Sequence, residues 1–371
     1  MTTEQIYALV NEVNYEAFGE GAIDVVDTSS LISLGKTVLS SSTNTEAFLN
    51  TLVQRIGRTI LRFRDYRNKL GDMVLNDFEY GAILQKIYVY MPEAEEDEAY
   101  DLVDGQSVDH YKISKPRVDQ KLFVTRTPYK FRITTQEDPI LTEAFTSASA
   151  MGAFIATTFG QVRNAIECSL ENLSRVTLAT AIAEAAGTTR MIDLVSTYNS
   201  LYTKTLDAVT CQNDPDFMRF AMSMINTYVD GIQDMSTLYN DGSLQTFTPR
   251  EDIRVKMISS FKRRLETVVE YAAFHDQFVR PDVDFTTLNF WQAAQDPLDV
   301  KITRPSDSQS VSRGNVIAIV HDRDAMGVYK KDQKVATTPL NADGLYYNTV
   351  YHMKELRFID LSENCIVFTL N

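Results

Sequence analysis

The sequence predicts an α+β fold that combines helices, a projecting β-hairpin and a late group of strands. Residues 78–136 are rich in β-branched and aromatic residues, in two runs that a polar stretch separates. Residues 138–187 keep the helical spacing of apolar residues over about three times the length of an average helix. After residue 315, β-branched and aromatic residues return in alternating runs, which predict strands.

The N-terminal part also shows helical spacing. Ile6, Leu9, Val10 and Val13 predict a helix over residues 4–18, and a polar stretch follows it. Residues 45–70 (TEAFLNTLVQRIGRTILRFRDYRNKL) then repeat an apolar residue every three or four positions, which predicts a second helix. The second half of this helix, here called the basic segment, carries six basic residues against Asp65, a net charge of +5: Arg55, Arg58, Arg62, Arg64, Arg67 and Lys69. Cations near the C-terminus of a helix are favourable in water, but a cluster of them can also bind an acidic partner.

The two strand-like runs predict an extended hairpin. FEYGAILQKIYVY (78–90) forms the outgoing arm and KLFVTRTPYKFRITT (121–135) the returning arm. A connection of this length inside a compact domain is usually functional or unstructured, so we expect the hairpin to project. The connection begins with PEAEEDEAYD (92–101), and we call its carboxylates the acidic tip: Glu93, Glu95, Glu96, Asp97, Glu98, Asp101 and Asp104.

The helical run that follows predicts one long helix. It begins after Asp138-Pro139, a helix-start signal, and Gly187 is a suitable C-cap. This gives roughly 35 to 45 helical residues, or about 55–65 Å at 1.5 Å per residue. Sustained heptads are missing, so the pattern indicates a single helix against which a sheet packs rather than a coiled coil.

The remaining sequence predicts a mixed lobe and then strands. In residues 188–315 Asp214 is an N-cap for a helix, and the strand-like run IRVKMIS (253–259) precedes a second helix. We therefore predict five parts, which are an arm with a helix, the hairpin, the long helix, the mixed lobe and the C-terminal strands: 1–77, 78–136, 137–187, 188–315 and 316–371.

Composition excludes several classes of protein. The 371 residues carry a formal net charge of −14, which argues against tight, non-specific binding of nucleic acid. Cys168, Cys211 and Cys365 form no CxxC pair, so we expect neither a disulfide framework nor a zinc site, and a reducing compartment. The N-terminus does not resemble a signal peptide, and no apolar run approaches the roughly 20 residues that span a bilayer.

No motif points to catalysis. Phosphate-binding loops, G-x-G-x-x-G, G-x-S-x-G and H-E-x-x-H are all missing from the sequence. His321-Asp322-Arg323-Asp324 could suggest a metal or nuclease site, but a turn with salt bridges is the favoured interpretation. The acidic tip lacks the ligand spacing and the glycine of a calcium loop, and Trp291 has the apolar neighbours of a core or interface residue. The sequence predicts no catalytic, cofactor-binding or metal site.

The order of these parts resembles the Hong Kong 97 (HK97) type major capsid protein of tailed bacteriophages and prophages. The likeness covers the whole chain and rests on the order of LVQRIGRTILRFRDYRNKL, FEYGAILQKIYVYMPEA and AIVHDRDAMGVYKK. It implies an HK97-like capsid fold with an N-arm (1–77), an E-loop hairpin (78–136), a peripheral domain with its spine helix (137–187), an axial domain (188–315) and strands that return to the peripheral domain (316–371).

The resemblance implies a structural function without enzymatic activity. Such subunits self-assemble into pentamers and hexamers that form an icosahedral shell around packaged double-stranded DNA. The resemblance also implies assembly in the host bacterial cytoplasm and a place in the virion capsid. It implies portal and scaffolding proteins as partners, weak contact with packaged DNA, and no contact with a membrane. Two alternatives stay open: an encapsulin-type nanocompartment shell, which shares the fold, and an enzyme with an unrecognised site.

The charge pattern adds a hypothesis about assembly. We expect the acidic tip of one subunit to contact the basic segment of an adjacent subunit, because these are the two dense blocks of opposite sign. Exposed ion pairs contribute only about 0–1 kcal/mol each, but the contact would repeat around every ring of subunits. The alternative is that the acidic tip is a solvated loop that keeps the protein soluble.

Overall fold

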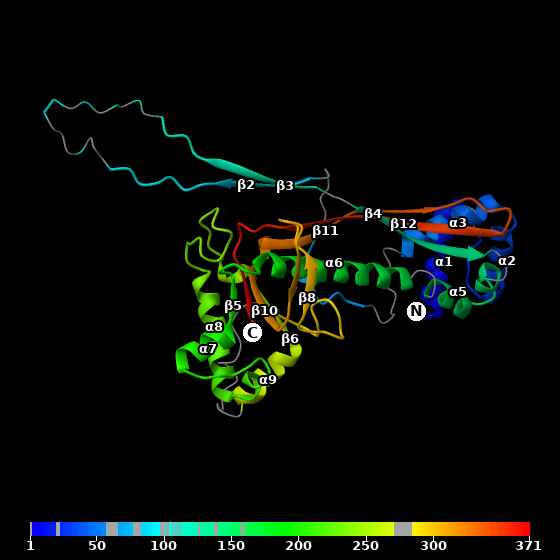
Figure 1. Ribbon diagram of the computed structural model, residues 1–371. Helices are drawn as coiled ribbons and strands as arrows, with labels where there is room; N and C mark the ends of the chain where they lie inside the picture. Colours follow the sequence, from blue (N-terminus) through cyan, green and yellow to red (C-terminus); the bar gives the residue numbers. More distant parts are fainter. Residues whose placement is uncertain are drawn as a thin grey trace. The chain divides into compact units, whose positions relative to one another are not determined.

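The computed structural model describes residues 2–19, 23–56, 66–76, 83–96, 113–124, 127–136, 140–156, 160–270 and 284–371, and six single positions between 100 and 111. The chain forms two compact units, and each unit takes three stretches of sequence (Figure 1). Unit 1 comprises Met1–Glu79, Arg126–Val176 and Val328–Leu356. Unit 2 comprises Tyr80–Thr125, Thr177–Gly327 and Arg357–Asn371.

Three helices open unit 1: α1 (Thr3–Phe18), α2 (Thr28–Leu39) and α3 (Ser42–Ile56). The predicted first helix is confirmed, and a capping box at Thr2 begins it. Helix α2 was not predicted, because Asp27 and the serines after it look like a polar loop. Asp27 is in fact an N-cap that accepts a hydrogen bond from the Ser30 amide. The predicted second helix does not reach residue 70, since residues 66–68 are not helical.

A four-stranded sheet completes unit 1, in the order β1-β11-β12-β4. Strand β1 pairs parallel with β11, and β12 pairs antiparallel with β4 over ten residue pairs from Tyr346↔Gln136 to Glu355↔Thr127. Tyr347 and Met353 of β12 lie in one apolar core with residues of α1, α2 and α3. The strands are β1 (Val74–Asn76), β4 (Thr127–Gln136), β11 (Met326–Thr337) and β12 (Tyr346–Ile359).

The predicted long helix does not run unbroken from its predicted start after Asp138-Pro139, because its first turns are separate from the rest. Ser147 has extended backbone angles (φ −158°, ψ 160°), and its side chain accepts a hydrogen bond from the Ala150 amide at 3.1 Å. A serine that caps a new helix cannot continue the previous one. The short α4 (Thr142–Ala144) is therefore separate from α5 (Ala148–Ile155). Residues 157–159 lie outside the described residues, and the 25-residue α6 (Gln161–Ala185), about 37 Å long, follows them.

Unit 2 is built on a five-stranded mixed sheet in the order β5-β13-β10-β6-β7. The central strand β10 is antiparallel to β13 and β6, and all seven of its residues are buried. Three helices pack against this sheet in one apolar core, and Asp214 caps the second of them as predicted. The elements are β5 (Met191–Asp193), β6 (Ile253–Ile258), β7 (Asp284–Leu288), β10 (Val316–Asp322), β13 (Cys365–Thr369), α7 (Leu194–Tyr202), α8 (Pro215–Gly231) and α9 (Ser259–Glu270).

Two hairpins extend unit 2. One is β8 (Val300–Thr303) with β9 (Ser310–Arg313), and the other is β2 (Ile83–Val89) with β3 (Val118–Val124). The predicted returning arm, 121–135, is thus two strands. Its first part belongs to β3 and pairs with β2, whereas its second part lies within β4 and pairs with β12.

The C-terminal strands also divide, against the prediction that 316–371 returns as one block to the peripheral domain. Strands β11 and β12 join the four-stranded sheet, while β10 and β13 join the five-stranded sheet. The burial patterns give the reason. Every residue of β10 and β13 is buried, as expected for inner strands of a sheet covered on both faces, whereas β12 mixes buried and exposed residues.

Candidate assembly surface

The β2-β3 hairpin has two different faces. Side chains alternate along a strand, and in β2 Gln85, Ile87 and Val89 are exposed while Leu84, Lys86 and Tyr88 are half-buried. Ile87 and Val89 each keep 62% of their surface exposed. Cross-strand register places Val118 (55% exposed) opposite Val89, and Leu122 (53%) opposite Gln85, on the same face. We call this set the outer face: Gln85, Ile87, Val89, Val118, Gln120 and Leu122.

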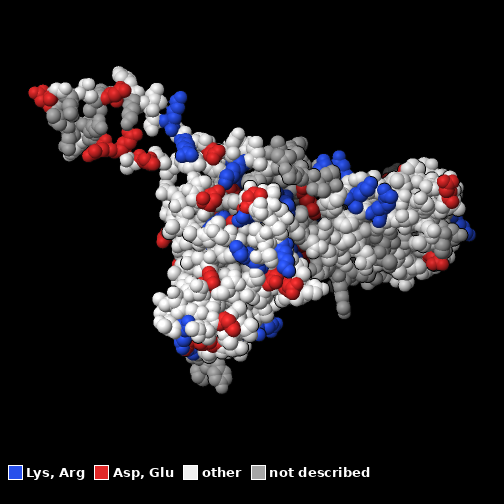
Figure 2. Space-filling model, viewed as in Figure 1, with Lys and Arg blue, Asp and Glu red and all other residues white. Residues whose placement is uncertain are grey.

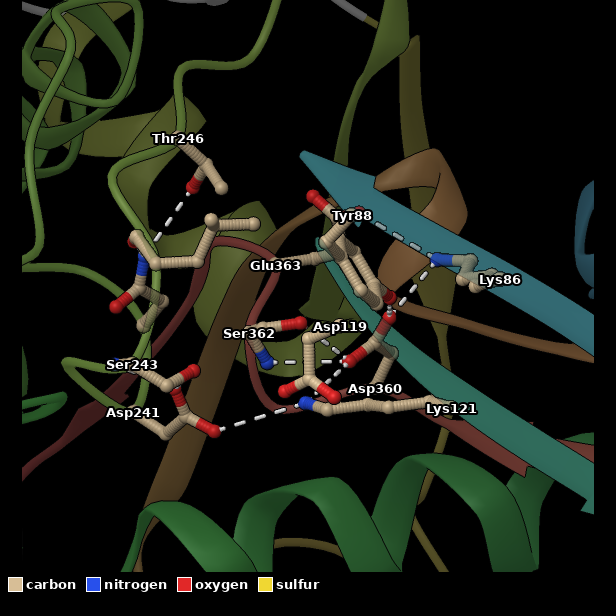
Figure 3. A network of polar contacts seen from close by, with 12 residues as sticks. Lys86, Tyr88, Asp119, Lys121, Asp241, Ser243, Thr246, Asp360, Ser362 and Glu363 are labelled. Atoms are coloured by element: carbon tan, nitrogen blue, oxygen red, sulfur yellow. Dashed lines mark hydrogen bonds and ion pairs between the residues drawn. The ribbon is translucent and has the colours of Figure 1, made fainter. Parts of the chain in front are cut away.

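The opposite face of the hairpin, the inner face, is bonded to the rest of unit 2 by a polar network (Figure 3). At its centre Asp360, whose side chain is fully buried, accepts hydrogen bonds from both strands. Lys86 Nζ of β2 lies 3.1 Å from Oδ2, and Lys121 Nζ of β3 lies 3.1 Å from Oδ1. The Tyr88 hydroxyl also donates to Oδ2. Ser362 donates to Oδ1 through its amide at 3.2 Å and its hydroxyl at 2.6 Å.

Further contacts surround this carboxylate. Lys86 Nζ donates to the Asp324 carbonyl oxygen at 2.6 Å and lies 3.4 Å from Glu363 Oε1. Lys121 Nζ lies 3.8 Å from Asp241 Oδ2. Apolar contact supports the same face, because the rings of Phe123 and Phe358 are 5.5 Å apart between centroids. The inner face thus combines charge, hydrogen bonds and ring packing.

Burial and charge shift the titration of these groups. Burial raises the pKa of Asp360, but hydrogen bonds from Ser362 and Tyr88 and the charges of Lys86 and Lys121 outweigh it and lower this pKa to about 2. Burial also raises the pKa of Glu363, and the charge of Lys86 only partly opposes that shift. Asp360 is therefore ionised at neutral pH.

The acidic tip is only partly within the described residues. Glu93, Glu95, Glu96 and Asp104 are exposed, and Figure 2 shows Asp and Glu side chains along this connection. Asp97, Glu98 and Asp101 lie outside the described residues. Aromatic and aliphatic side chains accompany the acids: Tyr100 (85% exposed), Tyr111 (89%) and Ile113 (80%).

The basic segment also lies largely beyond the part of the chain that the structure describes. Arg58, Arg62 and Arg64 and the side chain of Arg55 fall outside it, whereas Arg67 and Lys69 are described and exposed. The end of the segment is fixed on α6 within unit 1. The amide of Tyr66 donates to Asn164 Oδ1 at 3.1 Å, and Glu171 Oε2 accepts from the Tyr66 hydroxyl and from the Lys69 amide.

The other candidate groups are structural. In His321-Asp322-Arg323-Asp324, Asp322 caps a short 3-10 turn by accepting from the Asp324 amide at 2.7 Å, and Arg323 lies 3.6 Å from Asp252. This confirms the predicted turn with a salt bridge. Trp291 is buried and donates to the Val316 carbonyl oxygen at 2.8 Å. Within the described ranges no group of three His, Cys, Asp or Glu residues could hold a metal ion, and no helix is long and apolar enough to cross a membrane.

Sequence reasoning missed the Asp360 network, although one signal was present. The runs ILQKIYV and VDQKLFV each carry a lysine at the fourth position, and the hairpin register sets Lys86 directly opposite Lys121. Like charges that face each other across two strands destabilise the pair. A hairpin with this register is therefore stabilised by an anion from elsewhere in the chain that lies between the two lysines.

Comparisons with known proteins agree with this architecture. The chain resembles a chain in the capsid structure of Staphylococcus phage Andhra, at 11% identity and a TM-score of 0.52, over 84% of this chain and 87% of that one. It also resembles a chain in the structure of head fiber and inner core protein gp22 of native bacteriophage P68, at 12% identity and a TM-score of 0.55, over the same shares. At such identities the likeness concerns the fold, which is consistent with the predicted HK97-like α+β architecture. A search of curated proteins finds no match.

The sequence itself matches a family. The family model described as Phi29-like phage major capsid protein covers residues 10–369. This match confirms the predicted resemblance to a phage major capsid protein, and the comparisons do not favour the encapsulin alternative. The chain therefore belongs to the Phi29-like phage major capsid protein family, and it is a structural protein of the virion capsid.

Proposed function

We propose that copies of this chain assemble into pentamers and hexamers that tile an icosahedral shell around packaged double-stranded DNA, with the β2-β3 hairpin as a contact between neighbouring subunits. The single observation that carries this proposal is the division of the hairpin into an anchored inner face and an exposed outer face. Ile87 and Val89 are 62% exposed although they belong to a strand with a fixed register. Apolar side chains on a projecting element are typical of a contact surface.

The same proposal covers the partners and the division of the chain. Assembly takes place in the host bacterial cytoplasm, with portal and scaffolding proteins as partners. A net charge of −14 favours weak rather than tight contact with packaged DNA, and the protein acts without enzymatic activity. Unit 1 supplies most of a peripheral domain, and residues 188–315 supply most of an axial domain.

The acidic tip and the basic segment form the polar part of the contact. Glu93, Glu95 and Glu96 are exposed, as is Arg67 at the far end of the basic segment. Each exposed ion pair contributes about 0–1 kcal/mol, whereas full burial of one aliphatic side chain contributes about 1.5–3 kcal/mol. The outer face therefore supplies most of the contact free energy, and the acidic tip favours the correct neighbour and register.

Charge reversal tests the polar part. Replacing Glu93, Glu95, Glu96 and Asp97 by lysine is expected to abolish or strongly reduce shell formation, because the tip then repels the basic segment. Negative-stain microscopy counts the shells, and circular dichroism with size-exclusion chromatography checks that the subunit stays folded. Normal shells at physiological salt would contradict the contact between the acidic tip and the basic segment.

Two further variants make the test specific. A control that reverses four exposed acids elsewhere changes the net charge by the same amount and is expected to assemble: Asp216, Asp230, Asp296 and Asp343. The opposite reversal, with Arg55, Arg58, Arg62 and Arg64 replaced by glutamate, is expected to fail alone. Combined with the reversed tip it is expected to recover shells, because the attraction then exists with the signs exchanged.

A further inference from the structure

The carboxylate of Asp360 stands where the hairpin meets the body of unit 2. Asp360 directly follows β12, and the turn 360–364 leads into β13. The Asp360 amide donates to the Ala325 carbonyl oxygen at 2.7 Å, and the Asp241 amide donates to the Leu361 carbonyl oxygen at 2.8 Å. These bonds and those from Ser362 fix the turn, so the carboxylate is a preorganised acceptor.

The hairpin presents a charge problem that this acceptor resolves. Lys86 and Lys121 are cross-strand partners in the β2-β3 register, so their ammonium groups share one face. Both are partly withdrawn from water, with side chains 19% and 34% exposed. Facing like charges weaken a strand pair, and a two-stranded hairpin alone is marginal in water. One carboxylate with each oxygen 3.1 Å from one ammonium nitrogen converts this repulsion into attraction.

The neighbouring carboxylates are weaker substitutes. Glu363 Oε1 lies 3.4 Å from Lys86 Nζ, and Asp241 Oδ2 lies 3.8 Å from Lys121 Nζ, so each of these contacts involves one lysine and is longer than those of Asp360. Of these three acids only Asp360 bonds to both strands and also to the Tyr88 hydroxyl. The position of the hairpin on the rest of unit 2 therefore depends on the Asp360 side chain more than on those of Glu363 and Asp241.

We propose that Asp360 is the positioning residue of the hairpin: it neutralises the Lys86–Lys121 pair, anchors the inner face on its own subunit and thereby presents the outer face to a neighbour. The last step rests on the proposed function of the hairpin as a subunit contact. The anchoring step does not, because it takes place within one folded subunit.

Hydrogen exchange on the unassembled full-length subunit tests the anchoring. In Asp360→Asn the amides of β2 and β3 are expected to exchange at least about tenfold faster than in the wild type, since the hairpin loses its counter-charge. Amides of β10 report on the sheet of unit 2 and are expected to stay unchanged. The control Asp343→Asn alters an exposed turn in unit 1 and is expected to leave the hairpin amides at the wild-type rate. Exchange within about twofold of wild type in Asp360→Asn would overturn the proposal.

A rescue variant separates charge from packing. Adding Lys121→Met to Asp360→Asn removes the repulsion between the lysines, so hairpin exchange is expected to slow again towards wild type. No slowing would mean that Asp360 acts only through the turn and would overturn its role towards the lysine pair. If Asp360→Asn does not fold, the variant Lys121→Gln tests the anchor instead. It removes the ion pair between β3 and Asp360, so the amides of β3 are expected to exchange faster than in the wild type. Unchanged exchange would contradict the anchor.

Assembly distinguishes this inference from the proposed function. Fast hairpin exchange together with normal shell formation supports the anchor and contradicts the hairpin as a necessary contact. Unchanged exchange in Asp360→Asn, together with failed assembly of the reversed tip, supports the contact and overturns the anchor.

Discussion

Single buried residues in this protein stabilise charged side chains that come from distant parts of the chain. Asp360 is the clearest case, because complete burial would favour its neutral form, yet five donor groups hold it ionised. The two lysines among these donors lie opposite each other on the hairpin. A side chain that is costly to bury alone thus becomes favourable where it meets two half-buried cations.

The lowered pKa of Asp360, about 2 against an ordinary 3.8, predicts a pH dependence of stability. The folded state binds this proton more weakly than the unfolded state, so the carboxylate stabilises the fold above pH 3.8 and loses that contribution as the pH falls towards 2. The difference corresponds to about 2 kcal/mol. We expect the stability advantage of the wild type over Asp360→Asn to shrink by this amount between pH 5 and pH 2, in urea unfolding of the unassembled subunit.

Glu363 provides a control of opposite sign. Its pKa is raised by burial, so its ionisation destabilises the fold as the pH rises past its unfolded value of 4.5. Glu363→Gln is therefore expected to gain stability relative to wild type from pH 4 towards neutral pH. An advantage of the wild type over Asp360→Asn that stays constant with pH would contradict the assignment for Asp360.

At the scale of elements, α6 organises its surroundings through one buried glutamate in each unit. In unit 1 Glu171 accepts hydrogen bonds from the Tyr66 hydroxyl and from Arg175, and in unit 2 Glu184 accepts from the amide and the hydroxyl of Ser306. Buried carboxylates on a helix require such partners. These hydrogen bonds explain why α6 carries buried polar residues at positions where an apolar residue would otherwise be expected.

The break between α4 and α5 is a second feature of the elements, and it predicts the effect of a single substitution. Ser147→Ala removes the N-cap of α5 and is expected to lower the free energy of unfolding by about 1 kcal/mol. The matched control is Ser149→Ala, two residues later on an exposed position of the same helix, where alanine is expected to be neutral or slightly stabilising. Equal effects of the two variants in urea unfolding would contradict the cap.

Two electrostatic effects oppose each other at the scale of the whole molecule. A net charge of −14 makes subunits repel, and salt weakens this repulsion. Salt also weakens the proposed attraction between the acidic tip and the basic segment, since the screening length falls from about 10 Å at 0.1 M to about 3 Å at 1 M. A single salt titration of assembly cannot separate the two effects.

Comparison with a neutral tip separates them. A variant with Glu93, Glu95 and Glu96 replaced by glutamine loses attraction to the basic segment. It is expected to assemble more slowly at 0.05 M salt than a variant of the same net charge with Asp216, Asp230 and Asp343 replaced by asparagine, as measured by light scattering. The ratio of the two rates is expected to approach one by about 0.5 M salt, because screening removes what the tip contributes. A ratio that does not change with salt would contradict the charge contact.

Much of the fold could be predicted from local patterns. The spacing of Ile6, Leu9 and Val10, the Asp214 cap and the strand-like runs on both sides of the acidic tip each depend on neighbours in sequence, and the structure has the corresponding elements. The lack of catalytic motifs and the order of the parts led to the capsid family, which the family match confirms. The contact between the acidic tip and the basic segment stays a prediction.

Only the tertiary structure decided how strands are shared and what holds the hairpin. Whether β4 continues the hairpin or joins β12, and whether β10 and β13 join one sheet or the other, depends on pairings between residues up to 228 positions apart, as for Glu355 and Thr127. Asp360 lies 239 positions from Lys121, so no local pattern marks it as their acceptor. The sequence by itself determined the charges of the segments and most of their helices and strands, because those depend on local spacing, although it did not reveal α2. Folding in three dimensions decided which lysines meet which carboxylate, because burial and long-range contact exist only there.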